Sequence, residues 1–221
     1  MGLINFNQLH KADIIFTTNR DSSISKTIRA ATNSICSHTM LVVNDSEIID
    51  ATAHGVSVRR WSQAKIDCTL AIVMRRKNLL SGTDQDKVVA AARSFENLPY
   101  DTVGAAGSGM YGNQRNRILA GVGCVVFVPA CARIAIQISE NAKDENADKK
   151  FFCSELVSRS FSIAGFPVVR GRATDTTPGG LYVSTDLEYV GHLIEDKPVK
   201  SRAISPEEFE KNRRRGYRKD Y

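Results

Sequence analysis

The stretch FFCSELVSRSFSIAG, residues 151–165, predicts the helix around which the fold of this chain is organised. Apolar and small side chains recur in it at the spacing of a single helical stripe: Leu156, Val157, Ser160, Phe161 and Ala164. Such a stripe is typical of a helix that buries one face in a core, and a glycine such as Gly165 commonly ends a helix. We therefore expect a helix that begins at Cys153.

Cys153 at the start of this helix is well placed for nucleophilic chemistry. Unpaired N–H groups and the positive end of the helix dipole stabilise a thiolate, and a neighbouring imidazolium would lower the pKa of the thiol further. The Cys153 N–H is also a candidate donor to the oxyanion of a tetrahedral intermediate, whereas the sequence names no second donor. The alternative is a small buried hydrophobic residue, the usual place of a free cysteine. We apply that interpretation to the remaining cysteines: Cys36, Cys68, Cys124 and Cys131.

Upstream of residue 101, short apolar segments alternate with turns. Apolar or alternating stretches predict strands at residues 12–17, 39–43, 47–52, 55–60 and 69–74. Helical spacing predicts helices at residues 23–31 and 84–95. The polar residues 44–46 are typical of a hairpin turn, so we expect an antiparallel sheet.

His38 and Asp50 are the candidate partners of Cys153. His38 stands where a polar stretch meets the strand 39–43, a rim position that suits a general base. Asp50 lies on the neighbouring strand of the hairpin, so its carboxylate can reach the imidazole and orient it. Glu47 is the weaker candidate, because side chains alternate along a strand and it points to the opposite face. The other histidines are interpreted as surface or structural residues: His10, His54 and His192.

Length and composition fit one globular domain, which we place at residues 1–205, followed by a basic tail at residues 206–221. Of the 221 residues, 42% are hydrophobic and 24% are charged, close to the averages of globular proteins. The net charge of +6 favours anionic partners such as cell-wall polymers, lipid head groups or nucleic acid. The tail itself is typical of a solvated chain end. The apolar segment 118–132 is short for a membrane span and predicts a buried element, with a membrane or lipid contact as the alternative.

Other functional classes lack support in the sequence. The five cysteines include no CxxC pair and no ligand cluster appears, so we expect reduced thiols, no metal and no cofactor. The glycine-rich residues 104–112 lack a phosphate-binding pattern. No nucleic-acid-binding motif accompanies the positive charge, so we expect no nucleic-acid partner. The first residues show no basic start followed by a long apolar run, and we expect no classical signal peptide.

The chain carries a set of short motifs at residues 13–16 (DIIF), 37–40 (SHTM), 48–51 (IIDA), 99–101 (PYD), 152–157 (FCSELV) and 177–181 (TPGGL). Together they resemble the circularly permuted NlpC-type papain-fold family, from about residue 12 to about residue 195 and in the permuted order of histidine, acid and cysteine. The resemblance implies an α+β, papain-like fold whose antiparallel sheet supplies His38 and Asp50 and packs against the helix bearing the catalytic cysteine. Members often have glutamate or histidine at the third position, where this chain has Asp50.

The same resemblance implies a cysteine hydrolase with Cys153 as nucleophile, His38 as general base and Asp50 as the residue that orients it. The family includes peptidases of bacterial cell-wall stem peptides, amidases and relatives similar to lecithin-retinol acyltransferase. We expect cleavage of amide bonds in peptidoglycan stem peptides, because a basic protein suits an anionic wall.

An antibacterial effector toxin or lysin of this kind would be made in the cytoplasm and reach the periplasm of target cells by a specialised secretion route. Its partners would then include delivery machinery and an immunity protein. One alternative is a lipid-directed thioesterase, phospholipase or acyltransferase that uses the same thiolate. Another is an inactive module that binds anionic lipid or nucleic acid.

Overall fold

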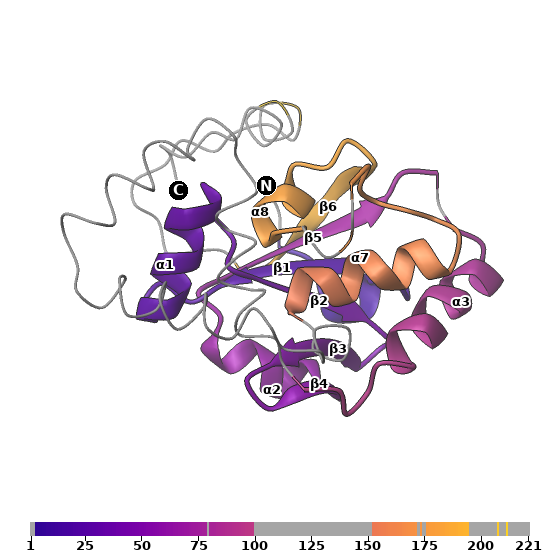
Figure 1. Cartoon of the computed structure of the whole chain (residues 1–221), viewed down its shortest axis with the longest axis horizontal. Coiled ribbons are helices and arrows are strands. Elements are labelled where there is room, and N and C mark those ends of the chain that lie inside the picture. The colour runs from indigo at the N-terminus through magenta and orange to yellow at the C-terminus, as the bar shows by residue number, and fades with distance from the viewer. Residues whose placement is uncertain are drawn as a thin grey trace, which may run out of the picture.

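A six-stranded antiparallel sheet forms the centre of the computed structural model, which describes residues 3–78, 80–99, 152–171, 173, 176–194, 207 and 211 (Figure 1). The strands are β1 (Ile14–Thr18), β2 (His38–Val42), β3 (Glu47–Thr52), β4 (Gly55–Arg60), β5 (Leu70–Arg76) and β6 (Leu187–Ile194). Their order across the sheet is β4-β3-β2-β1-β5-β6. Neighbours in the first half of this order are therefore also neighbours in sequence, so one meander of the chain builds the part of the sheet that carries His38.

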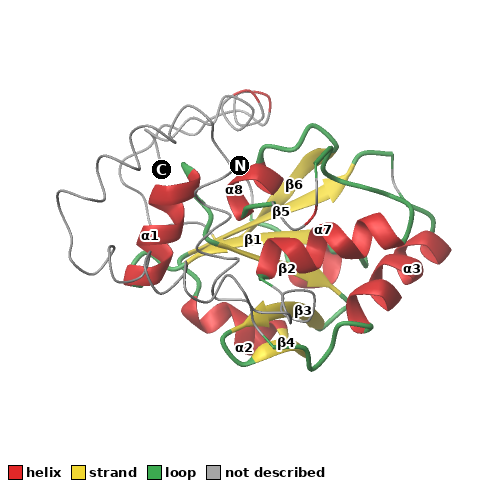
Figure 2. Ribbon diagram, in the orientation of Figure 1, coloured by secondary structure: helices red, strands yellow, loops and turns green. Residues whose placement is uncertain are grey.

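Helices of the described residues lie around this sheet. They are α1 (Ser23–Thr32), α2 (Trp61–Ala64), α3 (Gly82–Arg93), α7 (Cys153–Ile163) and α8 (Pro178–Tyr182), with 3-10 turns at Phe6–Gln8 and Lys65–Asp67. Helices α3 and α7 lie side by side over the strands, and α8 lies close to α1 (Figure 2). None of the helices in this part of the chain is both long and apolar enough to cross a membrane.

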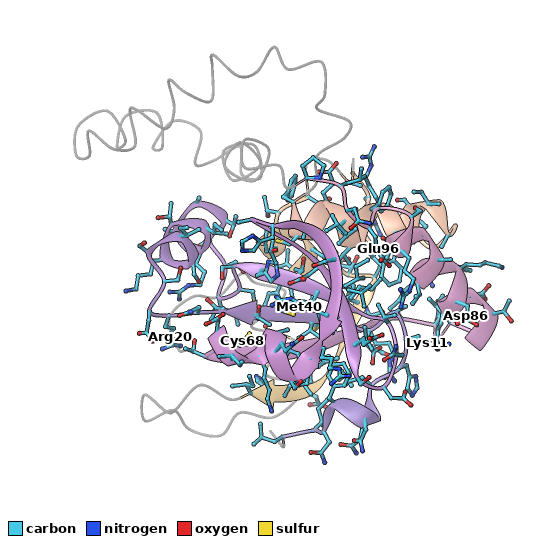
Figure 3. All side chains as sticks on the ribbon, turned by 90° about the horizontal axis from the view of Figure 1, so that it is seen from below. Lys11, Arg20, Met40, Cys68, Asp86 and Glu96 are labelled. Carbon is cyan, nitrogen blue, oxygen red and sulfur yellow. The ribbon has the colours of Figure 1, made fainter. Side chains whose placement is uncertain are left out.

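The two faces of the sheet bury alternating side chains, as the period of a β-strand requires. The face under α3, α7 and α8 presents Ile14, Phe16, Leu41, Ile49, Ile72 and Met74. The opposite face presents Ile15, Met40, Val42, Ile48, Ala71 and Val73, and is covered by α2 and the N-terminal segment. Figure 3 views the molecule from below and labels Met40 and Cys68, which both belong to this second layer.

The hairpin between β2 and β3 is fixed by the side chain of Asn44. Its Oδ1 accepts hydrogen bonds from the backbone N–H of Ser46 at 2.9 Å and of Glu47 at 3.0 Å. Such a local side-chain cap stabilises a tight turn. It sets the register in which Leu41 pairs with Ile49, and this register decides which residues of the two strands share a face.

Helix α7 has its buried side on the sheet and on α3. Its buried apolar residues are Leu156, Val157 and Phe161, which belong to the main core. Behind the first turn, the Ser154 hydroxyl donates a hydrogen bond of 2.6 Å to the carbonyl of Thr176 and ties α7 to the segment before α8. The helix ends at Ile163, and Gly165 takes a φ of +86°, a backbone conformation that glycine adopts without strain.

The prediction of an α+β fold with an antiparallel sheet is confirmed. The expected strands and helices are present with small shifts at their ends: the strand expected at residues 69–74 continues to Arg76, and the helix expected at 84–95 begins earlier, at Gly82. The sequence pattern did not predict β6 or α8. Some predictions lie outside the described residues: those on residues 100–151, including Cys124, Cys131 and the apolar segment 118–132, and nearly all of the tail at 206–221.

Candidate active site

His38 and Asp50 are brought together by the β2–β3 hairpin. Continuing the register of Leu41 with Ile49 by one pair sets Asp50 opposite Met40, two residues from His38 and on the same face of the sheet. The imidazole Nε2 of His38 lies 2.8 Å from Oδ2 of Asp50. The His38 side chain is 24% exposed, whereas that of Asp50 is fully buried. The contact therefore joins a rim histidine to an interior carboxylate.

Arg59 is the second partner of Asp50. In the β3–β4 pairing Asp50 stands opposite Ser57, so Arg59 is its diagonal neighbour on the same face. Its Nε donates to Oδ1 of Asp50 at 3.0 Å, and its Nη2 donates to Oδ2 at 2.6 Å. Both oxygens of the carboxylate are thus held by one planar guanidinium, a geometry that fixes the orientation of both groups.

Cys153 is the first residue of α7, with Phe152 as the N-cap. It is 4% exposed, and α7 packs on β2, the strand that begins with His38. The first N–H groups of a helix have no acceptor within the helix, so this end favours negative charge. The fold therefore brings the helix start that was predicted to carry the thiolate up to the strand that carries the imidazole.

Cys153 and His38 shift each other's pKa toward the charged forms. Burial opposes ionisation of the Cys153 thiol, but the charge of His38 and a hydrogen bond to it lower the thiol pKa below its usual value, with a smaller contribution from Thr39. Burial likewise opposes protonation of His38, yet Cys153 and then Asp50 raise its pKa to about 10. Both shifts favour a thiolate on Cys153 beside an imidazolium on His38.

Asp50 remains ionised despite its burial. Burial alone would raise the pKa of this carboxyl, but hydrogen bonds and charges from His38 and then Arg59 lower it below its usual value. Asp50 pairs through His38 Nε2, which leaves Nδ1 as the ring nitrogen for Cys153. The arrangement can hold a proton on Nε2 and exchange a second proton at Nδ1, which is what a general base requires.

Glu47 and the three histidines other than His38 lie outside the candidate site. Glu47 accepts a hydrogen bond of 2.7 Å from Asn44 in the hairpin turn, on the opposite strand face from Asp50. His10 and His54 are exposed, and His192 is buried with its Nδ1 hydrogen-bonded to the hydroxyl of Tyr189.

The other described cysteines are free thiols that burial keeps neutral. Burial raises the pKa of Cys36 far above its usual value and that of Cys68 to about 11. Neither is therefore a thiolate at neutral pH, and both shifts are opposite in direction to that of Cys153.

Arg59 is the site residue that sequence reasoning missed. The strand 55–60 was expected, but its arginines carry no pattern of their own. A usable signal was the short hairpin that pairs Thr52 with Gly55, since counting outward from that turn puts Asp50 and Arg59 on one face. An arginine diagonal to a buried aspartate is a cross-strand pair worth expecting.

A metal does not fit this donor set. Among the described residues there is no group of three or more histidine, cysteine and acidic side chains that could hold an ion. Both oxygens of Asp50 are already bound by Arg59 and His38.

This chain is similar to a curated protein and to a solved structure, while no family model matches it. The chain is 24% identical over 199 residues to a protein of Escherichia coli (strain K12) named "Probable lipoprotein peptidase YaeF", covering 84% of this chain and 71% of that one. The structure of this chain is similar to the crystal structure of the metalloprotein yiiX from Escherichia coli O157:H7. The TM-score is 0.57 and the identity 20%, and the match covers 83% of this chain and 97% of the other. The second likeness shows a shared fold.

Proposed function

We propose that this chain is a cysteine hydrolase in which Cys153 is the nucleophile, His38 is the general base and Asp50 orients His38. The observation that carries the proposal is the arrangement at His38, which contacts Asp50 at 2.8 Å and lowers the pKa of the Cys153 thiol. A thiolate at a helix start beside an imidazolium is the state in which cysteine attacks a carbonyl carbon. A permuted papain-like arrangement is part of the proposal, supported by the packing of α7 on the antiparallel sheet.

Acylation begins from the ion pair. The Cys153 thiolate adds to the carbonyl carbon of the substrate, and the resulting oxyanion lies near the N–H groups at the start of α7. As the intermediate collapses, the carbon–nitrogen bond breaks and the His38 imidazolium gives its proton to the leaving amine. The products of this half are the free amine, a thioester on Cys153 and a neutral His38.

Deacylation uses the neutral imidazole. His38 accepts a proton from water at Nδ1 while the water oxygen attacks the thioester carbonyl carbon. The carbon–sulfur bond then breaks, which releases the carboxylic acid product and restores the thiolate beside the imidazolium. Asp50 accepts a hydrogen bond from Nε2 in both halves and keeps the ring in the productive tautomer.

The substrate class that we propose is the amide bond of peptidoglycan stem peptides. The likeness to a protein named as a probable lipoprotein peptidase supports the hydrolysis of amide bonds. The net charge of +6 supports association with an anionic cell wall. Such an enzyme would act as an antibacterial effector or lysin in the periplasm of target cells, with an immunity protein in the producing cell.

The test is the release of new amino groups and muropeptide fragments from purified peptidoglycan. We expect release by the wild-type protein and none by Cys153→Ala or His38→Ala. The matched controls are Cys36→Ala and His54→Ala, which remove the same side-chain types outside the site and should retain release. Expression directed to a bacterial periplasm should be toxic for the wild type and harmless for Cys153→Ala.

Two results would contradict the proposal. Release that persists in Cys153→Ala would show that another group performs the chemistry. A folded wild-type protein that leaves peptidoglycan intact but releases fatty acid from a lipid panel would replace the amide substrate with an acyl lipid, with the same thiolate as nucleophile.

A further inference from the structure

The carboxylate of Asp50 is buried, and it has two cationic partners of different kinds. One is His38, which loses and regains a proton during the proposed reaction. The other is Arg59, which stays positively charged throughout. We infer that Arg59 is a positioning residue: its guanidinium supplies the countercharge that keeps Asp50 ionised and oriented while His38 is neutral. This inference rests on the proposed function and concerns its second half, the hydrolysis of the acyl-enzyme.

The need for a second cation follows from the reaction itself. Once His38 has given its proton to the leaving group, the ion pair between His38 and Asp50 no longer exists. A carboxylate with no exposed surface and no cation would take up a proton rather than stay charged. Arg59 prevents this, since its Nε and Nη2 remain bound to the two carboxylate oxygens at 3.0 and 2.6 Å.

Protonation of Asp50 would also reverse the tautomer of His38. A protonated carboxyl would donate to Nε2, so the ring proton would move to Nδ1, the nitrogen that must accept a proton from water. With Asp50 ionised, Nε2 is the donor at 2.8 Å and Nδ1 is free to accept. The countercharge therefore selects the tautomer that can act as a base.

The charged and titratable groups around this cluster come from several elements. Cys153 faces His38 from α7, and Asp50 and Arg59 come from β3 and β4. Asp67, the last residue of the turn Lys65–Asp67, and Cys68, which follows it, lie close enough to Arg59 to influence its charge. Asp67 and Asp50 both favour the charged form of Arg59, whose pKa is raised further above its usual value. None of these groups removes the positive charge of Arg59 in the neutral range.

The charges determine whether removing Arg59 raises or lowers the pKa of His38 in the acyl-enzyme. When the pair of His38 and Asp50 loses its proton, it changes from neutral overall to a net negative charge, which Arg59 stabilises. Removing Arg59 must therefore raise the pKa at which His38 becomes a base in the acyl-enzyme. Each unit of that rise slows deacylation about tenfold at a pH below the midpoint.

The experiment separates acylation from deacylation in the full chain. The protein is acetylated with p-nitrophenyl acetate, the release of nitrophenolate is recorded as a burst, and intact mass spectrometry follows the loss of the acetyl group over a series of pH values. For Arg59→Met we expect a burst rate within about threefold of wild type. We also expect at least about tenfold slower loss of the acetyl group at pH 7, with a midpoint shifted to higher pH.

The controls distinguish a countercharge from general damage. Arg75 holds the buried Asp13 with the same two-point geometry at 2.7 and 2.7 Å, so Arg75→Met breaks a matched pair outside the site and should leave both rates unchanged. Arg59→Lys keeps the charge but not the fork, and should restore most of the wild-type midpoint.

The experiment can refute the role of Arg59 without refuting the proposed cysteine hydrolase. No burst in the wild type, or a burst that survives in Cys153→Ala, would refute the cysteine hydrolase and the inference together. A normal burst in the wild type, with acetyl loss from Arg59→Met at the wild-type rate and midpoint, would overturn the inference alone. Equal slowing of both steps would also overturn it. If Arg59→Met does not fold, Arg59→Gln, a second neutral variant with a polar head group, decides the same question by the same midpoint.

Discussion

Asp50 and Asp13 are two buried aspartates with nearly the same surroundings, and the comparison of Asp50→Asn with Asp13→Asn isolates the role of the candidate site. Asp50 accepts two hydrogen bonds from Arg59 and contacts His38, while Asp13 accepts two from Arg75 and one from the backbone N–H of His10. Both side chains are at most 1% exposed. A difference between the two variants cannot then be attributed to burial or to the loss of an arginine fork.

The expected loss of stability is similar for Asp50→Asn and Asp13→Asn. Removing one member of a buried ion pair costs about 3–5 kcal/mol when the remaining charge has no compensation. Here the arginines keep 31% and 20% of their side-chain surface exposed, so water can hydrate the remaining charge and the lower end applies. We expect each variant to lower the free energy of unfolding by about 3 kcal/mol. Urea unfolding followed by fluorescence of Trp61, the only tryptophan of the chain, measures this loss.

Only Asp50→Asn should impair the reaction. Arg59 donates two hydrogen bonds and will hold the amide oxygen of the new side chain, which turns the amide NH₂ toward Nε2 of His38. That nitrogen must then accept, so the ring proton moves to Nδ1 and the base is lost. We expect hydrolysis to fall on the order of 10⁴-fold, the effect of the same change in a serine triad. Equal activity of the two variants, or a large stability loss in only one of them, would refute this reasoning.

Further outcomes follow from the thiol and from the packing of α8. In His38→Ala, burial is no longer offset and the pKa of Cys153 should rise, so alkylation of Cys153 by iodoacetamide at pH 7 should slow about tenfold or more. In the wild type, hydrolysis should decline as pH rises through about 10, because His38 loses the proton that the leaving group needs, whereas alkylation should not decline. Gly179→Ala would place a methyl 2.8 Å from the carbonyl oxygen of Thr32 and should cost about 1–3 kcal/mol in urea unfolding. Gly180→Ala, which meets only a side-chain hydroxyl at 3.2 Å, should cost less; the reverse order would contradict the packing of α8 on α1.

The parts of the fold that the sequence predicts are those in which periodicity is strong. Strands β1 to β5 carry apolar or alternating stretches bounded by turn residues, and α7 has a continuous apolar stripe, so their existence follows from local pattern. The strand β6 was missed because LEYVGHLI mixes charged, glycine and histidine positions, and it is stabilised by pairing with β5 at an edge of the sheet. The short α8 depends on its cap at Thr177 and on a close approach to α1.

Some residues of the candidate site could likewise be predicted from the sequence, and one could not. Cys153, His38 and Asp50 were named from residue type and position, since a helix start and a hairpin are local features. Arg59 was not, because its importance comes only from the strand register that makes it the diagonal neighbour of Asp50. Side chains that act through another side chain leave little trace in a single sequence.

The division of the site between a meander and a distant helix bears on the order in which it assembles. His38, Asp50 and Arg59 lie on successive strands joined by hairpins, and such local contacts form within about 1–10 μs. Cys153 joins them through packing between segments far apart in sequence, which is slower because the intervening chain must first be closed into a loop. Until α7 docks, Cys153 has no imidazolium beside it and behaves as an ordinary thiol. Cys153 is thus the last residue of the candidate site to be synthesised, and its sulfur meets His38 only when α7 docks on the sheet.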